Sequence, residues 1–268
     1  MGRLFGAFSA RLDELPAFRR WRKPVTQGVN PGRRGSYGID APIWVAFFAV
    51  VIAANVVNAA LSGKVWPLVP VVFLLACAGS CFYTTLRGKF VVWAGLLDRL
   101  GLRGNERILD LGCGRGAVLL LAAQRLTTGR AVGVDLWRSR DQSGNAADAT
   151  RRNAVAEGAA DRVELHTADM AALPLADDSF DLGLSSLAIH NISGRTGREK
   201  AIDEAVRVLR PGGRLMIADL WATRRYQTRL VTLGMSDVAR RGLGWRFWWG
   251  GPWAATRLVT ATKPERRI

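Results

Sequence analysis

A glycine-rich turn is the part of this chain whose residue types and spacing most clearly suggest chemistry. Residues 106–117 read ERILDLGCGRGA, a buried-strand pattern that runs into closely spaced glycines and then into an apolar helix pattern. Glycine allows a sharp turn and lets the backbone approach a bound cofactor with no Cβ between them. The sequence therefore predicts a strand at 107–111, a cofactor-binding turn at 112–116 and a helix at 116–126.

Three aspartates narrow the kind of cofactor, because the glycine spacing alone also fits a dinucleotide-binding fingerprint. Asp135 ends the next predicted strand, 131–134, where a carboxylate can bind both hydroxyls of a ribose. Asp110 lies in the approach to the turn, where it would repel a pyrophosphate and attract a cationic ligand. Asp169 follows a third predicted strand, 163–167, and can accept a hydrogen bond from an adenine amino group. This arrangement disfavours a nicotinamide oxidoreductase.

These motifs, together with two further downstream, resemble the class I S-adenosylmethionine (SAM)-dependent methyltransferases, especially their type 11 small-molecule branch. The motifs are LDLGCGRG at 109–116, VGVD at 132–135, ADM at 168–170, LPL and DSFD at 173–181, and LRPGGRL at 209–215. The resemblance covers about residues 100–220. Because the motif set is intact and in order, it favours an enzyme over a SAM-binding scaffold without turnover.

The resemblance implies a set of SAM-binding residues and no metal site. The glycine turn would pack along the methionine and ribose parts of SAM, Asp135 would bind the ribose hydroxyls and Asp169 the adenine amino group. Leu136 would press on the adenine face, and the Met170 amide would bond to a ring nitrogen. The full expected set is Asp110, Gly112, Cys113, Gly114, Gly116, Asp135, Leu136, Asp169, Met170 and Ser185.

His190 is the candidate for the methyl-transfer chemistry itself. It follows the fourth predicted strand, 182–185, at the mouth of the expected site. Its imidazole titrates near neutral pH and can act as a general base, although a role only in positioning the substrate fits the sequence equally well. Asp219, at the end of the fifth predicted strand, is a further candidate for the same pocket. The Asn/Asp-Pro-Pro-aromatic signature of many nucleic-acid methyltransferases does not follow the fourth strand, which argues against methylation of base amino groups.

Alternating strands and helices must position these residues. Strands are predicted at 107–111, 131–134, 163–167, 182–185 and 214–218, helices at 90–100, 116–126, 146–157 and 199–209, a loop at 211–213, and a last strand pair at about 236–240 and 257–262. The pattern predicts an α/β, Rossmann-like, doubly wound and mostly parallel seven-stranded sheet that ends in an antiparallel strand pair. Ligands of such sheets bind at the carboxyl ends of the strands, where the aspartates and His190 lie.

Two uncharged segments, 41–63 and 65–86, precede this domain. Each has the length of about 20 helical residues that crosses a bilayer core. Neither shows the period of an amphipathic surface helix, and the short link between them predicts an antiparallel transmembrane hairpin. Trp44, Trp66 and Tyr83 lie near the segment ends, where aromatic rings favour the membrane interface.

Two alternatives remain for the hairpin at this stage. It could be a buried part of a soluble fold, which would suit the amides of Asn55 and Asn58. Those amides could instead bond within the hairpin or to a second copy of it, which would make a homo-oligomer.

The charges around the hairpin predict its orientation. Arginines and lysines flank it on both sides at Arg19, Arg20, Arg22, Lys23, Arg33, Arg34, Arg87 and Lys89, whereas the turn carries Lys64 alone. By the positive-inside rule, both termini and the catalytic domain are cytoplasmic and the hairpin lies in the cell (inner) membrane. SAM is made in the cytoplasm, which agrees with this topology.

The segment 242–257 is rich in tryptophan, with Trp245, Trp248, Trp249 and Trp253 beside Arg246. Three roles fit this composition: a lid over an apolar substrate, an anchor at the membrane interface, or packing between the last two strands. The cysteines show no spacing typical of a zinc site or of a disulfide framework.

The chain of 268 residues is thus expected to comprise a basic and partly amphipathic arm at 1–40, a transmembrane hairpin at 41–86 and a methyltransferase domain at 87–268. The net charge of +16 favours anionic partners, and the hairpin makes lipid headgroups a better prediction than nucleic acid. The predicted function is methylation of a hydrophobic acceptor such as a lipid, fatty acid, quinone or prenylated metabolite. The alternative is methylation of RNA or protein, with the hairpin used only for localisation.

Overall fold

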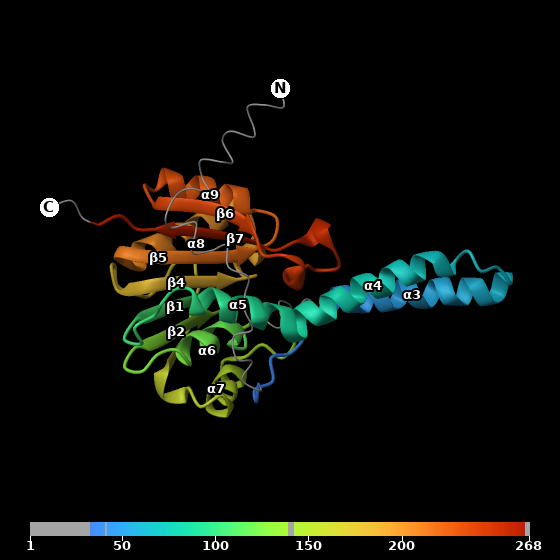
Figure 1. Cartoon of the computed structure of the whole chain (residues 1–268), viewed down its shortest axis with the longest axis horizontal. Helices are drawn as coiled ribbons and strands as arrows, with labels where there is room; N and C mark the ends of the chain where they lie inside the picture. The colour runs from blue at the N-terminus through green and yellow to red at the C-terminus, as the bar shows by residue number, and fades with distance from the viewer. Residues whose placement is uncertain (1–32, 41, 139–141, 266–268) are drawn as a thin grey trace, which may run out of the picture.

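The computed structural model describes residues 33–40, 42–138 and 142–265. They form an α/β domain from one side of which a pair of long helices projects (Figure 1). The amphipathic helix predicted in the basic arm lies outside the described residues. Residues 33–40 of that arm pack against the α/β domain, since the Ser36 amide donates to Asn153 Oδ1 at 2.8 Å.

One seven-stranded sheet forms the centre of the domain, with the strand order β3-β2-β1-β4-β5-β7-β6. The strands are β1 (Arg107–Leu111), β2 (Arg130–Asp135), β3 (Val163–Thr167), β4 (Phe180–Ser186), β5 (Leu209–Asp219), β6 (Ser236–Gly242) and β7 (Arg257–Thr262). Strands β1 to β5 run parallel, and β7 pairs antiparallel with both β5 and β6. This confirms the predicted Rossmann-like sheet. Its order reverses at β1 and β4, where such sheets leave a crevice for ligands.

Helices cover both faces of the sheet. They are α5 (Lys89–Asp98), α6 (Ala117–Ala123), α7 (Ala147–Ala156), α8 (Arg195–Val208) and α9 (Thr223–Thr232). Ile108 of β1 shares a buried cluster with Trp93 of α5, whereas its neighbour Leu109 shares another with Ile202 of α8 and Leu230 of α9. Successive side chains of a strand point to opposite faces, so the consecutive buried residues 108–111 of β1 show that this strand is covered on both sides.

The start of β5 differs from the prediction. The strand begins at Leu209, so the segment predicted as a loop at 211–213 belongs to it. Gly212 has a φ of 77°, and its amide donates to the carbonyl of Lys263 at 2.8 Å. The Lys263 amide in turn donates to the carbonyl of Gly213 at 2.8 Å. The chain beyond β7 thus holds this segment in the sheet, a long-range contact that no local pattern reports.

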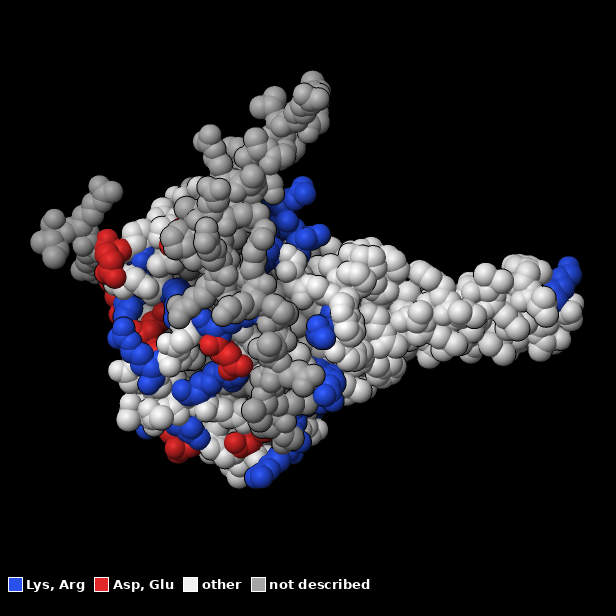
Figure 2. Space-filling model, viewed as in Figure 1, with Lys and Arg blue, Asp and Glu red and all other residues white. Residues whose placement is uncertain are grey.

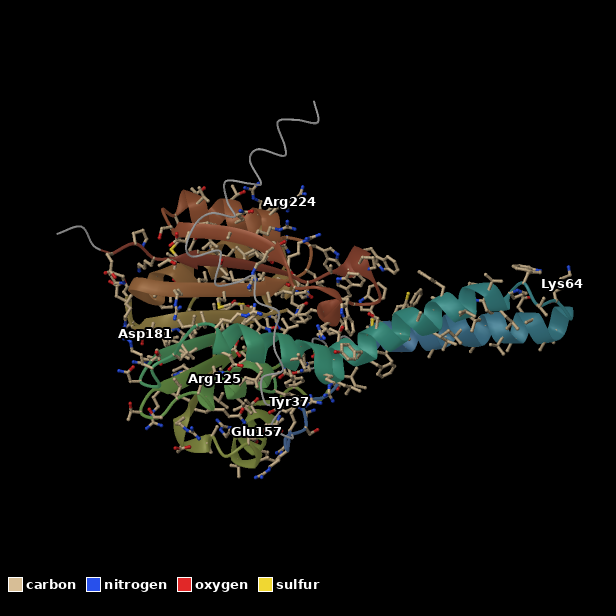
Figure 3. The ribbon with its side chains drawn as sticks, in the orientation of Figure 1. Tyr37, Lys64, Arg125, Glu157, Asp181 and Arg224 are labelled. Carbon is tan, nitrogen blue, oxygen red and sulfur yellow. The ribbon has the colours of Figure 1, made fainter. Side chains whose placement is uncertain are left out.

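The two apolar segments form a hairpin of α3 (Pro42–Ser62) and α4 (Leu68–Tyr83), which lie side by side (Figure 1). No residue of α3 is buried, whereas Val71, Cys77 and Cys81 of α4 are. The first segment is therefore not a covered core element of the described fold. Its surface is uncharged in Figure 2 up to its far end, where Figure 3 labels Lys64. By length and composition, α3 and the longer helical stretch Leu68–Asp98, which begins with α4, could cross a membrane, with mean hydropathies of 2.1 and 1.8.

The second segment and the helix after it are continuous, whereas the sequence predicted two separate helices. Helix α4 runs through a π-helical turn, Thr84–Gly88, directly into α5. Trp93 and Leu97 of α5 are almost completely buried against the sheet. The packing of α5 therefore fixes where the hairpin stands relative to the strand ends.

Candidate active site

A cavity of about 870 Å³ begins at the carboxyl ends of β1 and β2 and extends to the first turns of α3. At one end it is lined by polar residues of the strand ends, among them Asp110 and Asp135. At the other it is lined by apolar side chains of the hairpin and of the tryptophan-rich segment, including Phe48 and Trp253. The two ends are contiguous, so a molecule at the strand ends can contact a second molecule that touches the hairpin.

The glycine turn forms the floor of the polar end. Gly112 has a φ of 72°, which an L side chain rarely adopts, and a Cβ added there would lie 2.2 Å from Cβ of Ala188. The Gly112 amide donates to the carbonyl of Val134 at 2.8 Å and so ties the end of β1 to β2. Gly116 begins α6 with a φ of 86°. The backbone of the turn therefore forms part of the cavity wall at Gly112 and Gly114.

Asp110 is the residue of this site whose environment is most unusual. Its side chain is 1% exposed, and its Oδ1 has no hydrogen-bond partner among the described residues. Burial, reinforced by the negative charge of Asp135, raises the pKa of the Asp110 carboxyl to about 7. A buried carboxylate needs a compensating donor or positive charge. The ammonium and sulfonium groups of SAM would supply that charge, so this orphaned oxygen fits the cofactor that the motifs indicate.

Asp135 is held at the turn by backbone amides. Its Oδ2 accepts from Gly114 N at 2.8 Å and its Oδ1 from Trp137 N at 2.6 Å. Asn145 Nδ2 also donates to Oδ1 at 3.4 Å, so several donors fix the direction of this carboxylate at the cavity wall. Asp169 is oriented in the same way, since its Oδ1 accepts from Ala171 N at 2.9 Å.

The structure brings most of the sequence-predicted cofactor residues to the cavity. The residues that line it are Asp110, Gly112, Cys113, Gly114, Asp135, Leu136, Asp169 and Met170. Gly116 lies outside the lining, at the start of α6. Ser185 is also outside it, because this buried hydroxyl donates to the carbonyl of Leu111 at 3.0 Å. Ser186 lines the cavity in its place and accepts a hydrogen bond from Trp93 Nε1 at 2.9 Å.

His190 and Asp219, separate candidates in the sequence, form a pair in the structure. His190 Nδ1 bonds to Asp219 Oδ1, and the His190 amide donates to Asp219 Oδ2 at 3.1 Å. Asp219 is fully buried and also accepts from Leu220 N at 2.7 Å and from the Tyr226 hydroxyl at 3.1 Å. Because a carboxylate only accepts, Nδ1 carries the hydrogen, and the lone pair of the ring is then on Nε2. His190 lines the cavity, so this arrangement can take a proton from a bound molecule.

Tyr226 is a residue of this network that the sequence did not indicate. It lies on α9, a helix that was not predicted, and its ring is buried against the sheet. Burial and the neighbouring Asp219 carboxylate raise the pKa of the Tyr226 hydroxyl well above its usual value, so it remains a donor. A tyrosine in an arginine-rich segment gives no local sign of such a role.

A second missed group joins the cofactor turn to the residues before the hairpin. Gln142 Oε1 accepts from Arg115 N at 3.0 Å, and Gln142 Nε2 donates to Asp40 Oδ1 at 2.9 Å. Asp40 also pairs with the buried Lys89 Nζ at 2.5 Å. Nearby, the Tyr37 hydroxyl donates to Glu157 Oε1 at 3.0 Å, and Figure 3 shows both side chains below the base of the hairpin. The start of α3 is thus anchored to the glycine turn.

The sequence and the fold were compared with those of known proteins, and both resemble methyltransferases. Residues 109–217 match a family model described as a methyltransferase domain. This part of the chain is therefore similar to methyltransferase domains. The match includes the glycine turn and both Asp135 and Asp169, but it ends before Asp219 and does not reach the hairpin.

Two curated relatives are similar over this domain. The ubiquinone/menaquinone biosynthesis C-methyltransferase UbiE of Roseobacter denitrificans is 36% identical over 124 residues, which are 46% of this chain and 46% of that protein. The methyltransferase GfsG of Streptomyces halstedii is 38% identical over 125 residues, 47% of this chain and 41% of that protein. The chain thus spans about half the length of these relatives or less.

Solved structures confirm the methyltransferase fold. The geranyl diphosphate C-methyltransferase of Streptomyces coelicolor aligns with a TM-score of 0.51 at 18% identity, over 63% of this chain and 78% of that one. The [4+2]-cyclase SpnF aligns with a TM-score of 0.52 at 20% identity, over 64% of this chain and 82% of that one. Since the names of these two proteins describe different reactions, the acceptor and the reaction must be argued from the site.

Proposed function

We propose that the chain is a membrane-anchored SAM-dependent methyltransferase that acts on a hydrophobic small molecule. The observation that carries the proposal is a continuous cavity. It joins the strand ends, which carry the residues expected to bind SAM, to the apolar base of the hairpin. A cofactor at the polar end leaves the apolar end for the acceptor. Quinone biosynthesis and geranyl diphosphate, named for similar proteins, fit acceptors of this hydrophobic class.

In this proposal the strand ends hold SAM. Asp110 faces the positive charge of the methionine part, Asp135 binds the ribose hydroxyls and Asp169 binds the adenine amino group. The remaining contacts come from the residues that line the polar end, Gly112, Cys113, Gly114, Leu136 and Met170. When bound, SAM supplies an electrophilic methyl group, so the protein needs mainly to position the acceptor and exclude water.

His190 serves as the general base in the proposed reaction. Asp219 fixes the ring and stabilises the positive charge that forms when His190 Nε2 takes a proton. Tyr226 and the Leu220 amide hold the Asp219 carboxylate in place. The accepting atom is therefore one that loses a proton, such as a hydroxyl oxygen or an acidic carbon.

In this proposal the hairpin anchors the enzyme in a membrane. Its apolar helices cross the bilayer, with both termini and the α/β domain on the cytoplasmic side, and anionic headgroups contact the basic surface. Figure 2 shows basic side chains around the base of the hairpin, where headgroups would lie. Asn55 Nδ2 donates to the carbonyl of Val51 at 2.9 Å within α3, so this amide does not require a second copy of the chain.

The proposal can be tested with the full chain in vesicles of bacterial polar lipid extract. SAM with a labelled methyl group is added, and mass spectrometry follows the label into the organic extract. The expected result is a labelled hydrophobic product, which Asp135→Ala abolishes together with SAM binding. Failure to bind SAM, or label that enters only added RNA or protein, would contradict the proposal.

Methylation of RNA or protein is the second candidate, favoured by the net charge of +16. Binding through phosphate contacts would weaken steeply with salt. The apolar end of the cavity has no role in that reaction, which is why the first candidate is preferred.

A further inference from the structure

We infer that the acceptor is an amphiphile that binds with its reactive head at His190 and its apolar chain in a passage to the membrane, between the first turns of α3 and residues 249–254. This inference rests on the proposed function and specifies its substrate class. It also specifies a lateral route, in which the acceptor enters from the bilayer without passing through water.

The passage is lined by side chains that suit an alkyl or prenyl chain. Its wall is formed by Ile43, Trp44 and Phe48 of α3, Cys81 of α4, and Trp249 and Trp253 of the tryptophan-rich segment. The charged residues at this side of the cavity, Asp40 and Lys89, are paired with each other. Among the described residues of this wall, an apolar chain of the acceptor therefore meets no uncompensated charge.

The tryptophan-rich segment is hydrogen-bonded to the end of α4 and to the turn after it, so the fold holds this wall of the passage in place. The carbonyl of Trp248 accepts hydrogen bonds from Thr84 Oγ1 at 2.7 Å and from Ser80 Oγ at 3.1 Å. A Cβ at Gly88 would lie 1.9 Å from the carbonyl oxygen of Arg246, so glycine is needed for this close approach. Thr84 and Gly88 belong to the π-helical turn Thr84–Gly88. Such turns are rare, and many of those known lie at functional sites.

The mouth of the passage lies where the hairpin would enter the lipid. Trp253 is 64% exposed and packs on Phe73 of α4, with ring centroids 5.6 Å apart. Trp44, on the opposite side, is 55% exposed. Tryptophan favours the interfacial layer of a bilayer, so these two rings mark the level at which the chain of the acceptor leaves the protein.

A buried donor indicates that the acceptor is not a plain hydrocarbon. Trp249 lines the cavity, and its indole N–H is buried without an acceptor among the described residues. An oxygen atom between the reactive head and the apolar chain, such as a carbonyl, ether or phosphate oxygen, would satisfy this donor. The substrate class is thus an amphiphile with an oxygenated head and one long apolar chain.

The first experiment uses the vesicle assay with labelled SAM and substitutions in the passage wall. Phe48→Ala and Trp253→Ala are expected to lower methyl transfer roughly tenfold or more at limiting acceptor, since each removes a large apolar contact. SAM affinity should stay unchanged, because neither residue lies at the strand ends. Phe47→Ala and Trp245→Ala are matched controls, since both side chains are exposed and outside the cavity lining.

The results separate the two proposals. If the wild-type chain transfers no methyl group to the lipid extract, the proposed function fails. If it does transfer, but Phe48→Ala and Trp253→Ala with intact SAM binding work at the wild-type rate, the lateral passage is wrong and the proposed function stands. A labelled product without an apolar chain would overturn the passage as well.

A second experiment does not depend on turnover. The probe is a phenol with a long alkyl chain that carries a diazirine near its end, and a short-chain phenol with the same diazirine is the control. After photolysis in vesicles, peptide mapping should place the long-chain adduct on the first turns of α3 and on residues 249–254, with competition by the lipid extract. Adducts spread evenly over the outer surfaces of α3 and α4 would overturn the inference.

Discussion

The two ends of the cavity are built in opposite ways. The cofactor end comes from short motifs at neighbouring strand ends, all within the methyltransferase match at 109–217. The apolar end comes from residues far apart in the chain, such as Phe48 and Trp253, which lie outside that match. The polar end thus lies within the stretch that resembles methyltransferase domains, whereas the apolar end is formed by residues outside that stretch. In the proposed function, the residues that bind the cofactor are therefore separate from those that bind the acceptor, so substitutions at one end should leave the other end unaffected.

The largest effect is expected from Gly112→Ala. Alanine would have to adopt the positive φ of this position, and its Cβ would lie 2.2 Å from Cβ of Ala188. The turn must therefore shift away from the position in which it would bind SAM. Strain and overpacking together are expected to cost about 2–4 kcal/mol of folding free energy, and SAM binding should fall below detection. Calorimetric titration with SAM and urea unfolding measure both. Gly101→Ala is the matched control, because Gly101 has a φ of 62° but nothing within 4 Å of the added Cβ.

The second largest effect is expected at His190, which lines the cavity and is the proposed general base. His190→Ala is expected to lower the rate of methyl transfer by about 10²–10⁴-fold and leave SAM affinity unchanged, as expected when a general base is removed. Asp219→Asn should change the pH–rate profile, because the amide no longer fixes the histidine tautomer. A His190→Ala variant with an unchanged rate and pH profile would assign His190 to packing alone.

A smaller effect is expected for Asp110→Asn. Since the carboxyl has a pKa of about 7, it is mostly neutral below that pH and ionised above it. The affinity for cationic SAM should thus rise as the pH increases from 6 to 8, and SAM binding at pH 7 should release protons. The asparagine variant should bind SAM about 10–100-fold more weakly at pH 8, the strength of a charged hydrogen bond, and lose this pH dependence. An unaltered pH dependence in the variant would place the titrating group elsewhere.

The smallest effect tests the support of the apolar end. Thr84→Val keeps the shape of the side chain but removes the hydrogen bond to the Trp248 carbonyl, which should cost about 0.5–1.5 kcal/mol. The expected result is faster proteolysis in the segment 245–254, together with wild-type SAM affinity. Weakened SAM binding in this variant would show that the two ends are coupled rather than separable.

Much of the fold was predictable because its signals are local. The strands β1 and β3 have the predicted bounds, and the antiparallel pair β6 and β7 lies where the sequence placed it. The extension of β5 to Leu209 was missed because it depends on pairing with Lys263. Helix α9 was missed because its apolar face, with Tyr226 and Leu230, is narrow and interrupted by arginines.

The candidate site shows the same division. The sequence predicted that the glycine turn, Asp110, Asp135 and Asp169 lie together, because each stands at a fixed distance along the chain from a strand end. Ser185 was placed wrongly with respect to the cavity, since one position along a strand changes the face on which a side chain lies. The sequence named His190 and Asp219 but could not show that they bond, because they come from different strand ends.

The sequence by itself determined the doubly wound sheet, the glycine turn after its first strand and two segments apolar enough to cross a membrane, since periodicity, glycine placement and charge act over short stretches of chain. Only the tertiary structure decided how α4 continues into α5, how the tryptophan-rich segment docks on that helix, and that both border the cavity that begins at the glycine turn. These relations depend on contacts between residues far apart in the chain, such as Thr84 with Trp248 and Gly88 with Arg246. No local pattern encodes such pairs, because each becomes close only when the helices pack on the sheet.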